Sequence, residues 1–174
     1  MAGQLVQVAT ETVTSAVSSV TLTGIDSDDV YMVAFNNVIP DTNQVYFNMR
    51  VTESGTANST SNYDQTYKVL KAAVGFANIG ATNGNSFGIL SEQYGTGGNE
   101  SANGVVYIYN ANNSSEYTFQ TSELSARDHN GNLLGNQGGG VFTSTSAVDG
   151  VNFFQNSGNI TSGVFTLYRI IWYE

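Results

Sequence analysis

A side-chain alternation with a period of two residues recurs along this chain, and no other feature restricts its fold as strongly. Residues 44–52, QVYFNMRVT, show it most clearly, and residues 30–38, VYMVAFNNV, show it again. Successive side chains of a β-strand point to opposite faces, so this alternation predicts strands that place one face on a hydrophobic core. In residues 44–52 the apolar face comprises Val45, Phe47, Met49 and Val51.

A helical interpretation fits the chain poorly. The longest candidate, LKAAVGFANIGA in residues 70–81, contains Gly75 and Gly80 and has no capping signal at either end. Glycine inside a helix costs about 1 kcal/mol relative to alanine, and uncapped ends leave backbone groups without partners. We therefore expect strand and loop in this segment.

The apolar stretches are short and are separated by turns rich in Gly, Asn and Ser, with a single proline, Pro40. Hydrophobic residues make up 40% of the chain and charged residues 11%, which is enough apolar material for a core. We see no internal repeat or linker. The pattern predicts an all-β fold, a single antiparallel, jelly-roll-like β-sandwich of about ten short strands over residues 1–174. Residues 1–23 are either an N-terminal arm or the first strands.

The segment 164–174, VFTLYRIIWYE, is the most apolar in the sequence. Burying one large apolar side chain contributes roughly 1.5–3 kcal/mol, so about five of them contribute roughly 10 kcal/mol. This is comparable with the net stability of a whole domain. An exposed strand of this kind would promote aggregation. We therefore expect a central strand, covered on both faces by the fold or on one face by a neighbouring subunit.

Charge excludes two classes of partner. Five Lys and Arg against fourteen Asp and Glu give a formal net charge of -9 at pH 7. This excess repels phosphate, so we expect no nucleic-acid partner. It also disfavours an anionic membrane, and no apolar run approaches the roughly 18 residues of a spanning helix.

The absence of Cys excludes disulfides, thiolate metal sites and a Cys nucleophile.

The residues that could carry catalysis or bind a metal have simpler interpretations. The only histidine, His129, lies in ARDHNGNLL, where HNG is typical of a turn, whereas a hydrolase triad needs an oriented, buried histidine. Asp26, Asp28 and Asp29 could offer oxygens to Ca²⁺, but the glycine and glutamate of an EF-hand loop are missing. We expect a solvated turn there.

Further candidates lead to the same conclusion. A glycosidase pair would need carboxylates such as Glu92, Glu100, Glu116 or Glu123, which lie in or near polar stretches. The glycine-rich segment 135–142, GNQGGGVF, has no lysine and no helix pattern after it, so we expect a flexible connection and no phosphate loop. The sequence predicts a protein that is not an enzyme and has no cofactor.

Ten tyrosines and one tryptophan allow two interpretations. They pack within the sheets with hydroxyls at the rim, or they form a recognition surface for a protein or a glycan. Arg pairs with carboxylates through two hydrogen bonds, and Trp and Arg are common at the centres of interfaces. The interface candidates are Arg50, Tyr168, Arg169, Trp172 and Tyr173.

Two segments, taken in order, carry a resemblance to a known family. The first is SVTLTGIDSDDVYMVAFNNVIPDTNQVYFNMRVTESGT in residues 19–56, and Tyr63 follows it after a Gly/Ser loop. The second is GVNFFQNSGNITSGVFTLYRI in residues 150–170. Together they resemble the opening and closing parts of a jelly-roll domain common in virion proteins of tailed bacteriophages. Where that family usually has LYGI, this chain has LYRI with Arg169, so we expect the last strand to extend beyond the usual bend.

The resemblance implies a location in the virion and a structural role without catalysis. It implies a capsid decoration or cement protein that forms a homotrimer and binds the major capsid protein or other virion proteins. The alternative is the head of a tail fibre or spike that binds a glycan on the host surface. Such heads usually follow a repetitive shaft, whereas strand patterns begin here at residues 4–8, which favours decoration.

Overall fold

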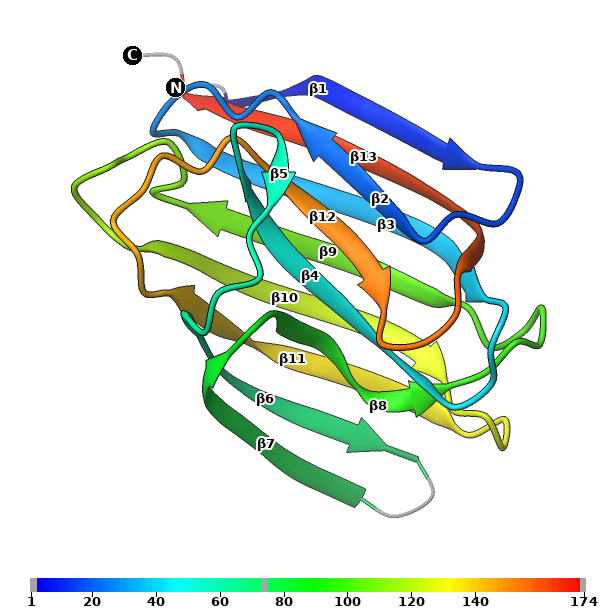
Figure 1. Cartoon of the computed structure of the whole chain (residues 1–174). Helices are drawn as coiled ribbons and strands as arrows, with labels where there is room; N and C mark the ends of the chain where they lie inside the picture. The colour runs from blue at the N-terminus through cyan, green and yellow to red at the C-terminus, as the bar shows by residue number, and fades with distance from the viewer. Residues whose placement is uncertain (1–2, 73–74, 173–174) are drawn as a thin grey trace.

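The computed structural model describes residues 3–72 and 75–172, and β-strands are the regular secondary structure of this part of the chain (Figure 1). None of the described residues forms a helix long and apolar enough to span a membrane. Within the described ranges there are thirteen strands: β1 (Gly3–Val13), β2 (Ser19–Thr23), β3 (Val30–Pro40), β4 (Val45–Glu53), β5 (Thr56–Ala57), β6 (Tyr63–Lys71), β7 (Gly75–Gly84), β8 (Phe87–Tyr94), β9 (Ala102–Tyr109), β10 (Thr118–Arg127), β11 (Leu133–Phe142), β12 (Gly150–Gln155) and β13 (Ile160–Trp172).

The strands form two antiparallel sheets that pack face to face. The large sheet has the order β1-β13-β3-β9-β10-β11-β6-β7, and the small sheet has the order β2-β12-β4-β5 with β8 also paired to β4. Figure 1 shows the small sheet in front of the large one. The predicted antiparallel β-sandwich is therefore confirmed, with more strands than the ten expected, and residues 3–23 contain its first two strands.

Near both ends of the sequence, consecutive strands lie in opposite sheets: β1 and β3 are in the large sheet, and β2 and β4 are in the small one. The last pair, β12 and β13, inserts between two earlier pairs: β12 lies between β2 and β4, and β13 lies between β1 and β3. This insertion is the jelly-roll-like element of the fold, and it joins the two ends of the sequence in both sheets. The contacts that hold the sandwich together are consequently non-local.

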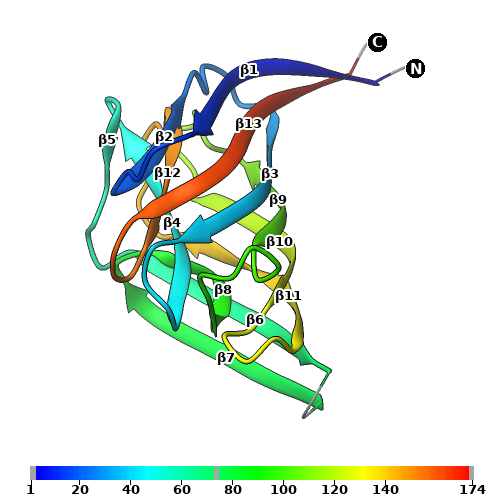
Figure 2. The same ribbon diagram turned by 90° about the vertical axis from the view of Figure 1, so that its right-hand side faces the viewer.

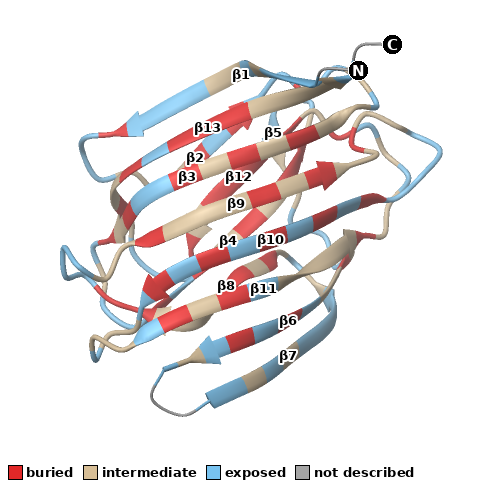
Figure 3. Cartoon of the chain, turned by 180° about the vertical axis from the view of Figure 1, so that it is seen from behind, coloured by how far each residue is buried: buried red, intermediate tan, exposed pale blue. Residues whose placement is uncertain are grey.

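The core lies between the sheets and is centred on phenylalanines from the inserted pair and its neighbours. Phe153 and Phe165 have ring centroids 5.3 Å apart, and Phe35 and Phe47 have centroids 5.4 Å apart. All four side chains are buried. Burial alternates along β4, as residues 44–52 predicted, and Figure 3 shows the same alternation along β3 and β10 of the large sheet. These three strands are thus held by one face.

The expectation for the glycine-rich segment 135–142 was wrong. This segment belongs to β11, which pairs with β10 and β6 inside the large sheet. Its glycines allow close packing: a Cβ on Gly138 would lie 2.2 Å from the carbonyl oxygen of Thr66, and one on Gly140 would lie 2.6 Å from the Phe87 ring. A strand of low propensity forms here because its neighbours fill the space that side chains would occupy.

The final strand follows its prediction only in part. β13 lies between β1 and β3, and its inward side chains Phe165 and Leu167 are fully buried. Beyond Leu167, however, no described residue of β13 is buried, and Trp172 is 67% exposed.

The segment 70–81, for which we expected strand and loop, forms the end of β6 and the beginning of β7. Residues 73–74 lie outside the described part.

We predict that Gly140→Ala destabilises the protein by about 1–3 kcal/mol, because the added methyl group would overlap the Phe87 ring. The measurement is the free energy of unfolding in urea. Gly98→Ala is the matched control, since no heavy atom lies within 4 Å of its Cβ position, and we expect a change within about 0.5 kcal/mol. Equal effects of the two substitutions would contradict the packing described for β11.

Candidate interaction surface

The outer face of the large sheet carries a row of apolar side chains that crosses its strands. Opposite residues of antiparallel strands share a face, and four pairs contribute: Leu5 with Ile170, Ile170 with Val30, Tyr109 with Phe119, and Phe119 with Val141. Val30 precedes Tyr31, which lies opposite Ile108, so Val30 and Tyr109 belong to the same row. We call this row the apolar stripe; it consists of Leu5, Ile170, Val30, Tyr109, Phe119 and Val141.

The stripe is accessible to a partner. Leu5 is 52% exposed and Phe119 is 46% exposed, and the other members are partly exposed. In the adjacent row, Tyr168 lies opposite Met32, and Met32 lies opposite Tyr107, all partly exposed. A contiguous apolar surface of this kind on a folded protein commonly marks an interaction site.

The same face carries no net charge among the residues that the structure describes. The strand registers place only Asp64, Lys68, Glu123 and Arg127 on it. Two negative and two positive charges cancel, whereas the chain as a whole carries -9. The excess negative charge therefore lies on other surfaces, and two copies could approach through this face without net repulsion.

A groove lies at one end of the apolar stripe. Its volume is about 520 Å³, and Tyr109, Phe119, Thr121, Thr66, Asp64 and Gly139 are among its lining residues. Gly139 has no side chain to fill the space above β11. The hydroxyl groups of Tyr109 and Thr121 are 3.2 Å apart, a hydrogen bond that holds the Tyr109 ring at the groove wall. The groove is therefore mostly apolar, with a few polar groups at its rim.

The other end of the stripe leads to the end of the β1–β13 pair, which we call the terminal ribbon: residues 3–7 of β1 paired with residues 168–172 of β13. In β13, Ile170 is the last residue paired with β3, whereas Ile171 and Trp172 pair only with β1. Figure 2 shows the two strands projecting together beyond the sandwich. A β-bulge between Gln7 and Ala9 marks the base of the ribbon, and bulges bend strands.

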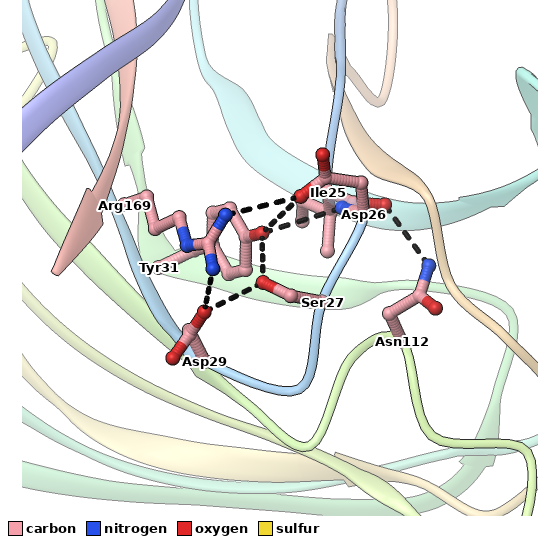
Figure 4. Close-up of polar contacts among 7 residues, drawn as sticks. All are labelled: Ile25, Asp26, Ser27, Asp29, Tyr31, Asn112 and Arg169. Carbon is pink, nitrogen blue, oxygen red and sulfur yellow. Dashed lines mark hydrogen bonds and ion pairs between the residues drawn. The ribbon is translucent and has the colours of Figure 1, made fainter. Parts of the chain in front are cut away.

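Arg169 closes the end of the sandwich beside the ribbon. Its Nη2 lies 2.5 Å from Asp29 Oδ2, and its Nη1 lies 3.5 Å from Asp26 Oδ1. The Tyr31 hydroxyl donates a hydrogen bond to Asp26 at 3.1 Å, and the Ser27 hydroxyl donates one to Asp29 at 2.7 Å (Figure 4). The Ser27 hydrogen bond and Arg169 hold the pKa of the Asp29 carboxyl below its usual 3.8.

The acidic turn between β2 and β3 is thus a structural element. The same turn is tied to a second loop, because Asn112 Nδ2 donates to the carbonyl oxygen of Ile25 at 3.0 Å, as Figure 4 also shows. In the described part of the chain, no group of three or more His, Cys, Asp or Glu could hold a metal ion.

The five interface candidates are divided between different environments. Tyr168 and Trp172 lie on the outer side of the terminal ribbon, with Tyr168 opposite Met32. Arg169 points the other way and forms ion pairs within the chain. Arg50 is in the small sheet, 4.3 Å above the Phe154 ring, and its Nε donates to the carbonyl oxygen of Asn85 at 2.9 Å. Tyr173 lies outside the described residues.

The residues considered for catalysis are dispersed. His129 lies in a turn that Asp128 holds by accepting hydrogen bonds from the backbone of Asn130 and Asn132 at 2.9 and 2.8 Å. The Nε2 atom of His129 lies 3.1 Å from Asn130 Nδ2. Glu92 pairs with Lys71, on the other side of the large sheet from the groove.

Two of the other carboxylates considered for catalysis, Glu100 and Glu123, have local partners as well. Glu100 accepts a hydrogen bond from the backbone of Gly97 at 2.8 Å, and Glu123 accepts one from Gln137 at 2.6 Å. Glu116 lies in the exposed loop before β10. Glu100 therefore stabilises a turn, and Glu123 takes part in a hydrogen bond on the surface of the large sheet.

The sequence interpretation missed Leu5, Tyr109 and Phe119 as parts of one surface. Each belongs to an alternating segment, so the sequence indicates that its side chain faces away from the core. Their alignment in a single row depends on the pairing register of four neighbouring strand pairs, which no local pattern contains.

Comparison with known proteins adds no family assignment. No protein-family model matches the chain, and no curated protein matches it. The functional interpretation therefore depends on the surfaces described above and on the resemblance in residues 19–56 and 150–170.

We predict that Asp29→Asn lowers stability at pH 7 by about 0.2–1 kcal/mol, the range for partly exposed ion pairs. The lowered pKa of Asp29 means that its contribution is present above about pH 4 and is lost as the pH falls further. Urea unfolding at several pH values should therefore show wild type and variant converging in acid. Asp28→Asn is the control, and a difference for Asp29→Asn that persists at pH 2 would contradict this account.

Proposed function

We propose that this chain is a non-enzymatic structural protein of a virion surface, a capsid decoration or cement protein that associates as a homotrimer. The observation that carries the proposal is the outer face of the large sheet, which has an apolar stripe and no net charge on a chain whose net charge is -9. This face would bind copies to one another and leave the charged loops in solvent.

The energetics favour association through this face. Burial of apolar surface contributes roughly 25 cal/mol per Å², and aromatic side chains supply large areas at a low cost in conformational entropy. The stripe and its adjacent row supply Tyr107, Tyr109, Phe119 and Tyr168. Approach through any surface that carries the carboxylate excess would instead be opposed by repulsion.

Two further observations support a structural role without catalysis. The carboxylates and the histidine considered for catalysis are engaged in separate turns and ion pairs, far from forming a shared site. The resemblance to phage virion proteins supports the location. On a repeating capsid lattice, a trimer would bind through several weak contacts at once, and the avidity would exceed each single affinity.

A second candidate is glycan binding, as expected of a fibre or spike head. The specific observation in its favour is the groove of about 520 Å³, where Tyr109 and Phe119 lie beside Thr66, Thr121 and Asp64. Sugar rings have apolar faces and polar edges, which match such a lining. Binding of recombinant protein to a glycan array, lost in Tyr109→Ala, would favour this candidate.

Copy number in the particle distinguishes the two candidates. We expect quantitative mass spectrometry of purified virions to find the chain in an amount comparable with the major capsid protein. An amount comparable with that of tail proteins would contradict the decoration role and favour a fibre head.

We predict that Phe119→Lys raises the dissociation constant of the self-associated protein at least about tenfold, equivalent to about 1.4 kcal/mol. The reason is that an ammonium group would have to be desolvated in the apolar contact. Light scattering coupled to size-exclusion chromatography measures the effect. Tyr46→Lys is the matched control, because Tyr46 is an exposed aromatic residue, 38% accessible, on the small sheet. An equal loss in both variants would contradict the assignment of the contact to the large sheet.

A further inference from the structure

We infer that the terminal ribbon of one copy places Trp172 in the groove of the next copy, so that the assembly is held by donor-to-acceptor contacts. This inference rests on the proposed self-association and names the two surfaces that would make it. The partner is a second copy of this chain.

Symmetry requires two different surfaces in a trimer. A two-fold contact uses the same patch on both partners, whereas a contact around a three-fold axis joins one patch to a different one. Each copy must therefore donate one surface and accept at another. The ribbon and the groove are two such surfaces, since they lie at opposite ends of the apolar stripe.

The ribbon has the properties of a donor. Trp172 and Leu5 are 67% and 52% exposed, although they are among the most apolar residues of the chain. A Cβ on Gly3 would lie 3.3 Å from the indole of Trp172, so the ring lies across the glycine and its other face is open. Pairing of β1 with β13 keeps this side chain on a rigid ribbon, which lowers the entropic cost of insertion.

The groove has the properties of an acceptor. Phe119 forms an apolar wall, and Gly139 leaves space above the sheet. The ribbon cannot reach the groove of its own chain, because β13 is separated from β10 by β3 and β9. Three strand spacings amount to roughly 14 Å, and the ribbon projects away from the sandwich (Figure 2). Insertion therefore has to occur between copies.

Charge also fits a second copy. Among the described residues of the ribbon, Arg169 is the one charged side chain, and its partners Asp26 and Asp29 belong to the same chain. Among the groove residues named above, Asp64 is the one charged group. A contact between ribbon and groove therefore brings together two nearly neutral surfaces of a chain that carries -9.

Trp172 is the only tryptophan of the chain, so its fluorescence reports the contact directly. We expect the emission of the wild-type protein to shift to longer wavelength when the assembly dissociates on dilution. Thr121→Arg should block the groove and weaken association at least about tenfold. Ser125→Arg is the matched control on the same face of β10, outside the groove of about 520 Å³, and should still associate.

Mixing two defective variants tests the donor and the acceptor separately. Trp172→Ala has an intact groove, and Thr121→Arg has an intact ribbon. Each alone should be monomeric at the concentration used, and each should still unfold cooperatively on heating. Their equimolar mixture should form a complex of two copies. The tryptophan signal of this mixture comes from Thr121→Arg alone, and its emission should shift to shorter wavelength as the ribbon enters the partner's groove.

The outcomes separate this inference from the proposed function. If the wild-type protein is a trimer and both variants also remain trimeric, self-association stands and insertion of the ribbon is wrong. A mixture that neither associates nor changes its emission likewise overturns the insertion. If the wild-type protein is monomeric at every concentration, the proposed self-association fails, and the insertion fails with it.

Discussion

The insertion of β12 and β13 between earlier strands is the constraint on which the rest of the structure depends. It brings Phe153 and Phe165 between the two sheets, where they contact Phe35 and Phe47. Without this pair, β1 would lose its connection to β3, and β2 would lose its connection to β4. Part of the apolar character of the C-terminal segment is thus explained by its packing in the core.

The core does not account for the whole segment. Up to Leu167 the inward side chains of β13 are buried, and from Tyr168 onward the strand continues past the core with large apolar side chains still present. Arg169 marks the change, because its ion pairs with Asp26 and Asp29 close the sandwich at this level. What lies beyond is available for contacts between molecules.

Several elements could be predicted from the sequence because their signal is local. The alternation in residues 44–52 predicted β4 and its buried face correctly, and the turn at Asp26–Asp29 was recognised from its polar composition. The segment 135–142 was misread as a flexible connection because glycine has low strand propensity. Its neighbours decide otherwise, since Thr66 and Phe87 fill the space on one side of the strand.

The sequence by itself determined the class of the fold and the side of each alternating strand that faces the core, because both follow from the two-residue period of a strand. Only the tertiary structure decided which strands are neighbours and in what register. That register aligns Leu5, Ile170, Tyr109 and Phe119 in one row and turns Arg169 toward an acidic turn more than a hundred residues earlier. Such alignments depend on contacts between distant segments, and short-range sequence patterns carry no information about them.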